Sequence, residues 1–146
     1  MIDIKRNHSL KKHNSFLFSY KAQFFCEVHS EEESHEFINF CLKKNLPINI
    51  LGEGTNVVIT KDIKGGVIKI SIPGKKIIGD EITIGAGENW HETVLWSLQN
   101  SLYGLENLTL IPGTAGAAPV QNIGAYGEEI SSRLSLIHIS EPTRPY

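Results

Sequence analysis

Two glycine-rich segments carry residue types suited to binding an anion. The first is LGEGTN at residues 51–56, and the second is IPGTAGAAPVQNIGAYG at residues 111–127. Glycine lets the backbone approach a ligand closely, and successive backbone N–H groups in such turns can form a concave site for phosphate. Thr55, Asn56 and Thr114 add hydroxyl and amide donors. These residues favour recognition of a phosphate-containing ligand.

The second segment holds no charged residue and is rich in glycine, alanine and proline. Small residues let an extended ligand lie against the backbone, and Pro112 followed by Gly113 is typical of a turn. The side chains of Gln121 and Asn122 offer amide groups to the polar edge of a heterocycle. Two such segments in one chain favour a dinucleotide-like ligand.

Each segment also has a purely structural interpretation. Gly52 and Gly54 would serve in a tight turn between two strands, and residues 111–127 would serve as a close-packed turn between two lobes. Glu53 is awkward for an anion site because its carboxylate repels phosphate, so we expect its side chain to point away. The chain has neither the G-x-G-x-x-G fingerprint nor a Walker A motif.

Composition narrows the class of protein. A chain of 146 residues with 40% hydrophobic and 21% charged residues is typical of one globular domain or two small lobes. A net charge of −2 argues against a nucleic-acid binder. The amino terminus has no apolar signal-peptide core, and no apolar stretch is long enough to span a membrane, so we expect a cytoplasmic protein without a membrane partner. Cys26 and Cys41 are then expected as reduced thiols, with a disulfide as the less favoured alternative. The histidines show no metal-ligand spacing, and no metal is expected.

The first half of the sequence predicts a strand, a helix and a second strand. Residues 22–28 read as a strand, and Ser30 with Glu33 forms a capping-box pattern at the start of a helix. Residues 48–51 read as the second strand, which gives a right-handed βαβ crossover. This order places the first glycine segment at the carboxyl end of a strand, where open α/β sheets bind ligands. The buried stripe of the helix is expected at Phe37, Ile38, Cys41 and Leu42.

The second half predicts short strands followed by another helix. The strands are expected within residues 57–60, 66–71, 75–79 and 81–87. The helix is expected to begin after an N-cap at Asn89, with Glu92 completing a box-like pattern, and to end at Gly104. Its core stripe is expected at Val94, Leu95, Leu98 and Leu102.

Asn89 and His91 could be taken for catalytic residues. We interpret them as structural, with Asn89 as a cap, His91 as a first-turn residue, and Trp90 and Trp96 as packing residues. The alternative is that this helix start binds an anion.

Four motifs in order resemble one enzyme family. They are HNSF at residues 13–16, ILGEGTNVVI at 50–59, GAGENWHETVLWSL at 85–98 and YGLENLTLIPGTAGAAPVQNIGAYG at 103–127. Together they are similar to the amino-terminal half of the UDP-N-acetylenolpyruvoylglucosamine reductases, from about His13 to about Ile130. The resemblance implies an α+β fold, namely the two-lobed FAD-binding domain of the vanillyl-alcohol-oxidase (PCMH) type, with its second lobe incomplete.

The resemblance also implies domain limits and cofactor contacts. Residues 1–15 would precede a first lobe at 16–72, and residues 73–133 would form part of a second lobe. The turn at 51–56 matches the family's pyrophosphate loop, and residues 111–121 match the segment along the flavin. The residues assigned in this way to FAD are Leu51, Gly52, Glu53, Gly54, Thr55, Asn56, Ile111, Pro112, Gly113, Thr114, Gly116, Ala117, Ala118, Pro119, Gln121, Asn122, Ile123 and Gly124.

The implied activity is a redox reaction, the reductive step of peptidoglycan synthesis. NADPH would reduce FAD, and the flavin would reduce the enolpyruvyl group of a UDP-sugar to give UDP-N-acetylmuramate, with Tyr126 near the sugar nucleotide. The family's proton-donor serine, its arginine and its late glutamate lie beyond the matched segment, so no catalytic residue is assigned here. Ser131 and Ser132 match nothing in the family. We expect a monomer that is inactive by itself.

Two alternatives to this family assignment stay open. One is a truncated flavin oxidase or dehydrogenase of the same superfamily, and the other is a non-catalytic flavin-binding module.

The carboxyl-terminal string LSLIHISEPTRPY, at residues 134–146, resembles a translated sequencing adapter. We therefore expect the native sequence to end near Arg133.

Overall fold

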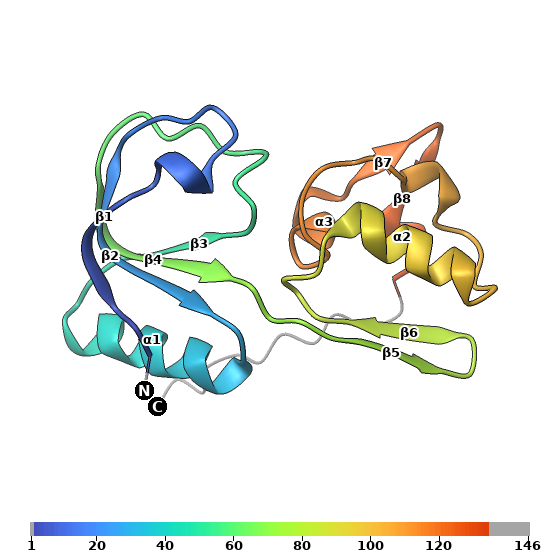
Figure 1. Cartoon of the computed structure of the whole chain (residues 1–146), viewed down its shortest axis with the longest axis horizontal. Coiled ribbons are helices and arrows are strands. Elements are labelled where there is room, and N and C mark those ends of the chain that lie inside the picture. The colour runs from blue at the N-terminus through green and yellow to red at the C-terminus, as the bar shows by residue number, and fades with distance from the viewer. Residues whose placement is uncertain (1, 135–146) are drawn as a thin grey trace.

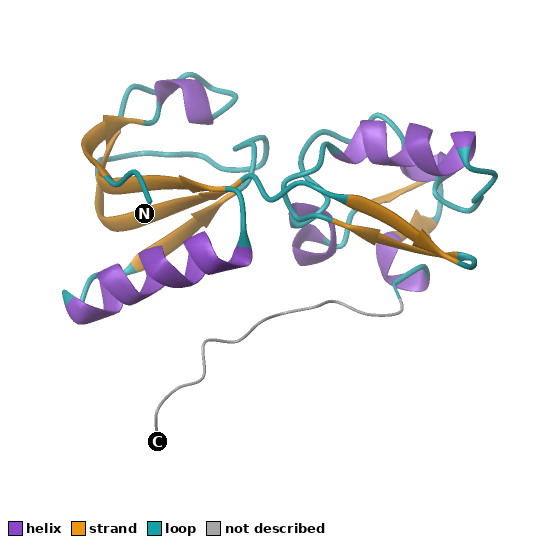
Figure 2. Cartoon of the chain, turned by 60° about the horizontal axis from the view of Figure 1, so that its bottom comes forward, coloured by secondary structure: helices purple, strands orange, loops and turns teal. Residues whose placement is uncertain are grey.

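The computed structural model describes residues 2–134, which form an α+β fold in two parts that lie side by side (Figure 1). The first part is a four-stranded sheet in the order β1-β2-β4-β3, with one long helix on one of its faces (Figure 2). Strand β1 is antiparallel to β2, whereas β2 and β3 are both parallel to β4. The elements of this part are β1 (Lys5–Ser9), η1 (Lys11–His13), β2 (Lys21–Val28), α1 (Glu31–Lys43), β3 (Ile48–Leu51) and β4 (Ile63–Ile70).

The predicted strand–helix–strand order is confirmed, with β4 inserted between β2 and β3 in the sheet. Strand residues alternate between the two faces of the sheet. Phe25 and Val67 therefore pack in one cluster with Leu10, while Cys26 and Ile68 pack in another with residues of α1. The two buried clusters fix which face of the sheet α1 covers.

The start of α1 follows the predicted cap, with one difference. The Ser30 side chain accepts a hydrogen bond from the Glu33 N–H at 3.2 Å, as expected. The Glu33 carboxylate accepts from the N–H of His29 at 2.7 Å, one residue before the cap. Leu42 was wrongly predicted as buried, since its side chain is 55% exposed. Phe40 takes its place against the cluster, where its ring lies 5.2 Å from that of Phe24.

One expectation about strands in this part is wrong. Residues 57–60 form no strand and pair with no strand of this sheet, and Ile59 is the single buried residue among them. The amino-terminal segment packs onto this part of the molecule, since β1 pairs with β2 and Leu10 is fully buried. The sequence gives no sign of β1 because its side chains are mostly exposed and it is held by backbone pairing at the sheet edge.

The second part contains a hairpin, the ten-residue helix α2 and several shorter elements. Its core combines Trp90, Val94, Leu108, Ala118, Ile123 and Ile130. The elements are β5 (Lys75–Ile78), β6 (Glu81–Ile84), α2 (Trp90–Gln99), η2 (Glu106–Leu108), α3 (Ala117–Gln121), β7 (Gly124–Ala125), β8 (Glu128–Glu129) and η3 (Ile130–Ser132). The glycine-rich segment at 111–127 thus folds into α3 and most of a small hairpin.

Helix α2 begins at the predicted cap but ends earlier than predicted. Its last turn closes as a Schellman motif, in which the Ser101 N–H donates to the Leu98 carbonyl at 3.0 Å and the Leu102 N–H to the Ser97 carbonyl at 2.9 Å. Ser101, at φ +61°, occupies the left-handed position that the sequence had suggested for Gly104. The helix therefore stops at Gln99.

The buried face of α2 also differs from the predicted stripe. Leu95 is 43% exposed, whereas the hydroxyl residues Thr93 and Ser97 are fully buried. Both hydroxyls donate to carbonyls of the helix itself, at 2.8 Å, so their burial leaves no polar group unpaired.

Among residues 2–134, no helix is long and apolar enough to cross a membrane. The expectation about a non-native tail concerns residues that lie, apart from Leu134, outside the described range.

Candidate functional site

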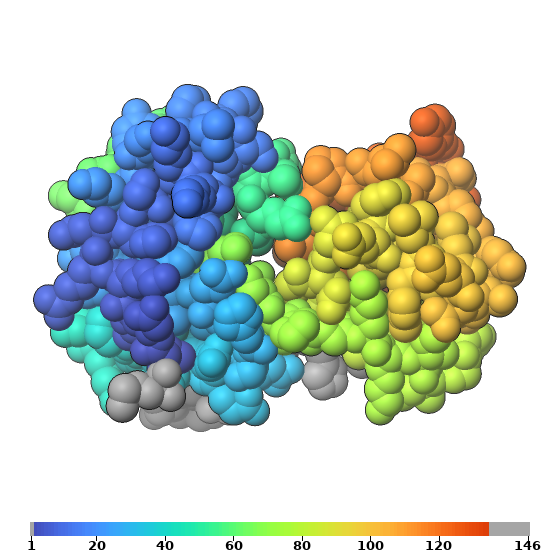
Figure 3. Space-filling view, viewed as in Figure 1, coloured from blue at the N-terminus to red at the C-terminus, as the bar shows by residue number. Residues whose placement is uncertain are grey.

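The two glycine-rich segments meet at the junction between the two parts of the molecule. A Cβ placed on Gly52 would lie 3.0 Å from Oγ1 of Thr114, and one on Gly113 would lie 3.3 Å from Oγ1 of Thr55. In the space-filling view, the teal-green segment after β3 faces the orange segment that follows residue 110 (Figure 3). Residues far apart in the sequence therefore lie together at this junction, which is a requirement if both segments are to hold one ligand.

The backbone amides of this junction are available to a ligand. Within residues 2–134, none of the N–H groups at positions 52–56 donates a hydrogen bond, and neither do those of Gly113 and Thr114. Gly54, Gly113 and Thr114 are buried. Because unpaired backbone N–H groups are costly when they lack water, a set of them at one junction fits an anionic ligand.

Gly54 adopts a backbone conformation that favours glycine. Its φ is +72°, and a Cβ there would overlap the carbonyl oxygen of His13 and lie 2.9 Å from Cα of Asn14. The Ser15 N–H donates to the Gly54 carbonyl at 3.1 Å. Glycine at this position is therefore required by packing against residues 13–15, in addition to any ligand.

Glu53 lies toward the start of α2. Its Oε1 accepts a hydrogen bond from Nδ2 of Asn89 at 3.3 Å, and the side chain is exposed. The Oδ1 of Asn89 in turn accepts from the Glu92 N–H at 3.0 Å, which makes Asn89 the N-cap of α2. Asn89 thus joins the cap of one helix to the first glycine segment.

His91 has a positioning role in the structure. Its Nδ1 lies 2.9 Å from Oγ1 of Thr109 and accepts from the Leu110 N–H at 3.2 Å, so the ring proton is on Nε2. The indole N–H of Trp90 donates to the Leu108 carbonyl at 2.8 Å. Together these side chains hold the stretch that leads into the second glycine segment, which supports their structural interpretation.

Several residues assigned to the cofactor by resemblance have their side chains committed elsewhere. Ala118 and Ile123 are buried in the core of the second part, and Ile111 packs against that core. Gly116 lies against Ala86, whose carbonyl accepts its N–H at 2.9 Å. These residues could offer only backbone groups to a ligand.

Other assigned residues lie at the surface around α3 and the β7–β8 hairpin. Pro112 and Gln121 are exposed, and Ala117 and Pro119 lie within α3. Asn122 ends α3 at φ +44° and donates through Nδ2 to Glu129 at 2.8 Å, so its amide is engaged. Gly124 pairs with Glu129, and Tyr126, expected near a substrate, is 91% exposed in the hairpin turn.

Asn14 and its neighbours pack against Gly54 of the first glycine segment, a role that we did not predict from the sequence. The side chain of Asn14 is buried and engaged in three hydrogen bonds within residues 10–18. The signal in the sequence was the HNSF string, which contributed to the family resemblance. The contact between residues 13–14 and Gly54 is a tertiary contact, so it could be identified only from the structure.

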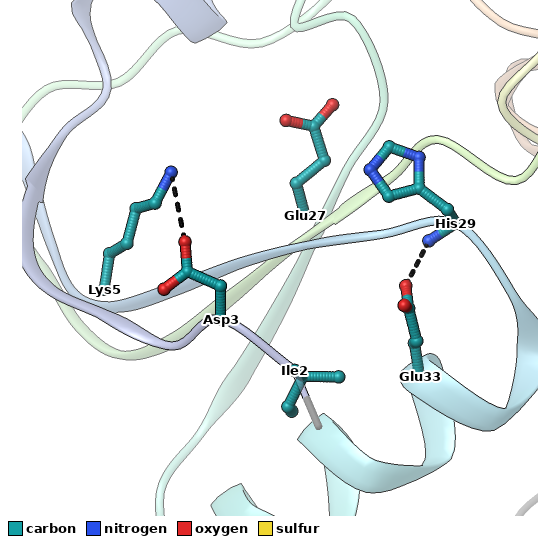
Figure 4. Close-up of a pocket in the computed structure, with 6 residues that line it drawn as sticks. All are labelled: Ile2, Asp3, Lys5, Glu27, His29 and Glu33. Atoms are coloured by element: carbon teal, nitrogen blue, oxygen red, sulfur yellow. Dashed lines mark hydrogen bonds and ion pairs between the residues drawn. The ribbon is translucent and has the colours of Figure 1, made fainter.

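A separate hollow of about 290 Å³ is lined by Ile2, Asp3, Lys5, Glu27, His29 and Glu33 (Figure 4). Its acidic groups are already paired. Asp3 lies 3.6 Å from the Lys5 ammonium, and Glu27 lies 2.8 Å from Lys69, whose hydrogen bond lowers the pKa of that carboxyl. None of the glycine-segment residues lines this hollow, so we do not assign the ligand site to it.

The fold and the amide-lined junction place the chain in the class of α+β domains that bind a nucleotide cofactor. The chain belongs to the FAD binding domain family, whose sequence profile matches residues 22–137. This result agrees with the two-lobed FAD-binding fold that the motifs implied.

Curated relatives narrow the comparison further. The chain is 44% identical over 134 residues to a UDP-N-acetylenolpyruvoylglucosamine reductase of Pseudomonas fluorescens, covering 88% of this chain and 40% of that protein. It is 46% identical to a protein of the same name from Flavobacterium johnsoniae, covering 88% and 39% respectively. The chain therefore spans about 40% of the length of these relatives.

A solved structure shares the fold. The UDP-N-acetylenolpyruvylglucosamine reductase (MurB) of Thermus caldophilus superposes with a TM-score of 0.65 at 23% sequence identity, covering 90% of this chain and 46% of that one. At this identity the likeness concerns the fold.

Proposed function

We propose that this chain holds FAD at the junction of its two parts, with the diphosphate of the cofactor against residues 52–56 and 113–114. The observation that carries the proposal is the set of backbone N–H groups there that have no acceptor within the described residues. A diphosphate supplies several anionic oxygens, which are strong acceptors for such donors. The narrow space at Gly52, where a Cβ would press on Thr114, fits a ligand that lies directly against the backbone.

We further propose that the whole protein reduces UDP-N-acetylenolpyruvoylglucosamine to UDP-N-acetylmuramate with NADPH as reductant. The support is the name and the 44–46% identity of the curated relatives, combined with the family of the matched domain. When bound, FAD supplies the redox chemistry between the nicotinamide and the enolpyruvyl group. The protein would act in the cytoplasm as a monomer, and its reaction would be one step of cell-wall synthesis.

The part of this chain in that reaction is binding and orientation. The first segment would fix the diphosphate through Gly52, Glu53, Gly54, Thr55 and Asn56, mainly by their backbone amides. The Thr114 hydroxyl, close to Gly52, would add a side-chain donor. On the surface, the exposed Tyr126 would be free to contact the UDP-sugar.

A flavin titration tests the binding proposal. Adding the 146-residue chain to FAD should quench flavin fluorescence to saturation, whereas riboflavin, which lacks the diphosphate, should bind at least about tenfold more weakly. Equal affinity for the two would show that the amides of the junction do not hold a diphosphate. No quenching at all would contradict flavin binding by this chain.

The reaction itself is tested on the complete protein. NADPH oxidation should require the UDP-sugar and should yield UDP-N-acetylmuramate as the reduced product. Flavin binding combined with no such product would favour a different oxidoreductase or a non-catalytic flavin-binding module.

A further inference from the structure

We propose that Asn14 is a positioning residue for the flavin diphosphate, because it sets the direction of the Thr55 N–H group. The inference rests on the proposed function and assigns a role to a residue that does not touch the ligand. It follows from a chain of contacts that runs from the Asn14 side chain to the peptide bond between Gly54 and Thr55.

The first link is the side chain of Asn14, which is 4% exposed. Its Nδ2 donates to the carbonyl of Leu10 at 2.7 Å and to that of Phe18 at 3.1 Å. Its Oδ1 accepts from the Phe18 N–H, also at 3.1 Å. Asn14 therefore ties together both ends of the turn at residues 10–18.

The second link is the contact between this turn and the first glycine segment. The Ser15 N–H donates to the Gly54 carbonyl at 3.1 Å, and the His13 carbonyl lies where a Cβ on Gly54 would stand. Both contacts are between backbone atoms, so the segment follows the turn closely. Leu10 is fully buried in the core of the sheet and anchors one end of the turn at residues 10–18.

The third link is the geometry of the peptide bond. In a trans peptide unit the C=O of one residue and the N–H of the next lie in one plane and point in opposite directions. Because the Gly54 carbonyl is held toward Ser15, the Thr55 N–H must point away from the turn. That N–H has no acceptor within the described residues and is one of the donors assigned to the diphosphate.

The test compares Asn14→Asp with a control substitution in a different buried cluster. Aspartate keeps an acceptor for the Phe18 N–H, but it turns a carboxylate oxygen toward the carbonyls of Leu10 and Phe18. Phe37→Leu is the control, since Phe37 is buried in the separate cluster under α1. The ligand-free chain is labelled with nitrogen-15, and the residual dipolar coupling of the Thr55 N–H, which reports the direction of that bond, is measured.

We expect the Thr55 coupling to change in Asn14→Asp and to stay as in the wild type in Phe37→Leu. The dissociation constant of FAD should rise about tenfold in Asn14→Asp, as expected when a hydrogen bond to a charged group is lost, and less than about twofold in the control. An unchanged Thr55 coupling would overturn the inference. So would a changed coupling with FAD affinity equal to that of the control.

Two further measurements keep the test decisive. If Asn14→Asp does not fold, Asn14→Ala replaces it, and the amide shift of Thr55 on adding FAD is followed in the wild type. A Thr55 amide that does not respond while FAD binds would overturn the inference. A wild-type chain that binds no FAD would instead contradict the proposed function, and the dipolar coupling in the ligand-free chain separates that failure from an error about Asn14.

Discussion

Gly52 and Thr114 lie so close that a Cβ added to the glycine would stand 3.0 Å from the threonine Oγ1. The pair joins the end of β3 to the segment before α3, across the junction of the two parts. The other neighbours of that Cβ, Cγ2 of Thr114 and Cβ of Ala117, would both be at 3.8 Å, an ordinary contact distance. The hydroxyl of Thr114 is thus the single tight neighbour.

This geometry makes Gly52→Ala a context-dependent substitution. In the wild-type background it should destabilise the chain by about 1 kcal/mol, because the Thr114 hydroxyl must shift. In a Thr114→Ala background the added methyl should cost much less. Thermal unfolding of the four chains in this double-mutant cycle measures the coupling. Additive effects would show that the two residues do not press on each other.

Gly54 and Glu53 are neighbours whose substitutions should differ greatly in their effect on stability. Gly54→Val places a Cβ onto the His13 carbonyl and forces a β-branched residue to φ +72°, so we expect a loss of more than about 2 kcal/mol in stability. Glu53→Gln keeps the contact with Asn89 at an exposed site and should change stability by less than about 0.5 kcal/mol. Denaturant unfolding of both variants measures the difference.

The same pair predicts the order of FAD affinities. Gly54→Val should weaken FAD binding more than Glu53→Gln does, since it displaces the backbone that carries the amide donors. Because Gly54→Val also destabilises the folded chain, part of its effect on FAD affinity is indirect. Each affinity must therefore be measured below the unfolding temperature of that variant. A weaker effect at Gly54 than at Glu53 would contradict binding through backbone amides.

How far the sequence predicted this molecule depends on where each signal came from. Ser30 and Asn89 form caps within their own helices, so the starts of α1 and α2 were predictable from local sequence. Strand β1 was not, because its formation depends on pairing with β2. The strand expected at 57–60 failed for the converse reason, since only Ile59 is buried there and the segment has no partner strand.

The candidate site shows the same division. The first glycine segment was placed correctly at the end of β3, because strand order alone predicts that position. Helix α3 was missed, since a run of alanine, proline and glycine has no clear helical pattern. Its first turn is fixed by the Thr114 carbonyl, which accepts from the N–H groups of Ala117 and Ala118, both at 3.1 Å. Likewise, no sequence pattern indicates that Asn14 supports Gly54.

His8 and His13 should make the stability of the chain depend on pH. Their Nε2 atoms lie 3.2 Å apart, and the two rings lie 4.4 Å and 4.7 Å from the ring of Phe25. Burial lowers the pKa of both rings below the ordinary value of 6.5. The charges of Lys5 and Lys69 act in the same direction, against smaller opposing effects of Asp3 and Glu27.

The sign of the dependence follows from these shifts. Because the folded rings bind protons less readily than the unfolded ones, their full contribution to stability is present above pH 6.5 and is lost as the pH falls from there through the lowered values. We expect the unfolding free energy to decrease between pH 7.5 and pH 5.5, and to decrease less in His8→Gln. His29→Gln, with an exposed ring, is the control. Equal slopes in His8→Gln and the wild type would contradict a role of the pair.

Cys26 and Cys41 are free thiols in the same buried cluster, on β2 and α1. Burial raises the pKa of Cys26 to about 11, and it also raises that of Cys41. Since the thiolate is the reactive form, both residues should react slowly with a disulfide reagent at pH 8 in the native chain and quickly in denaturant. Cys26→Ala and Cys41→Ala should each remove half of the thiols titrated in denaturant. Fast modification of either cysteine in the native chain, at a rate independent of added denaturant, would show that the cluster between α1 and the sheet is open to solvent.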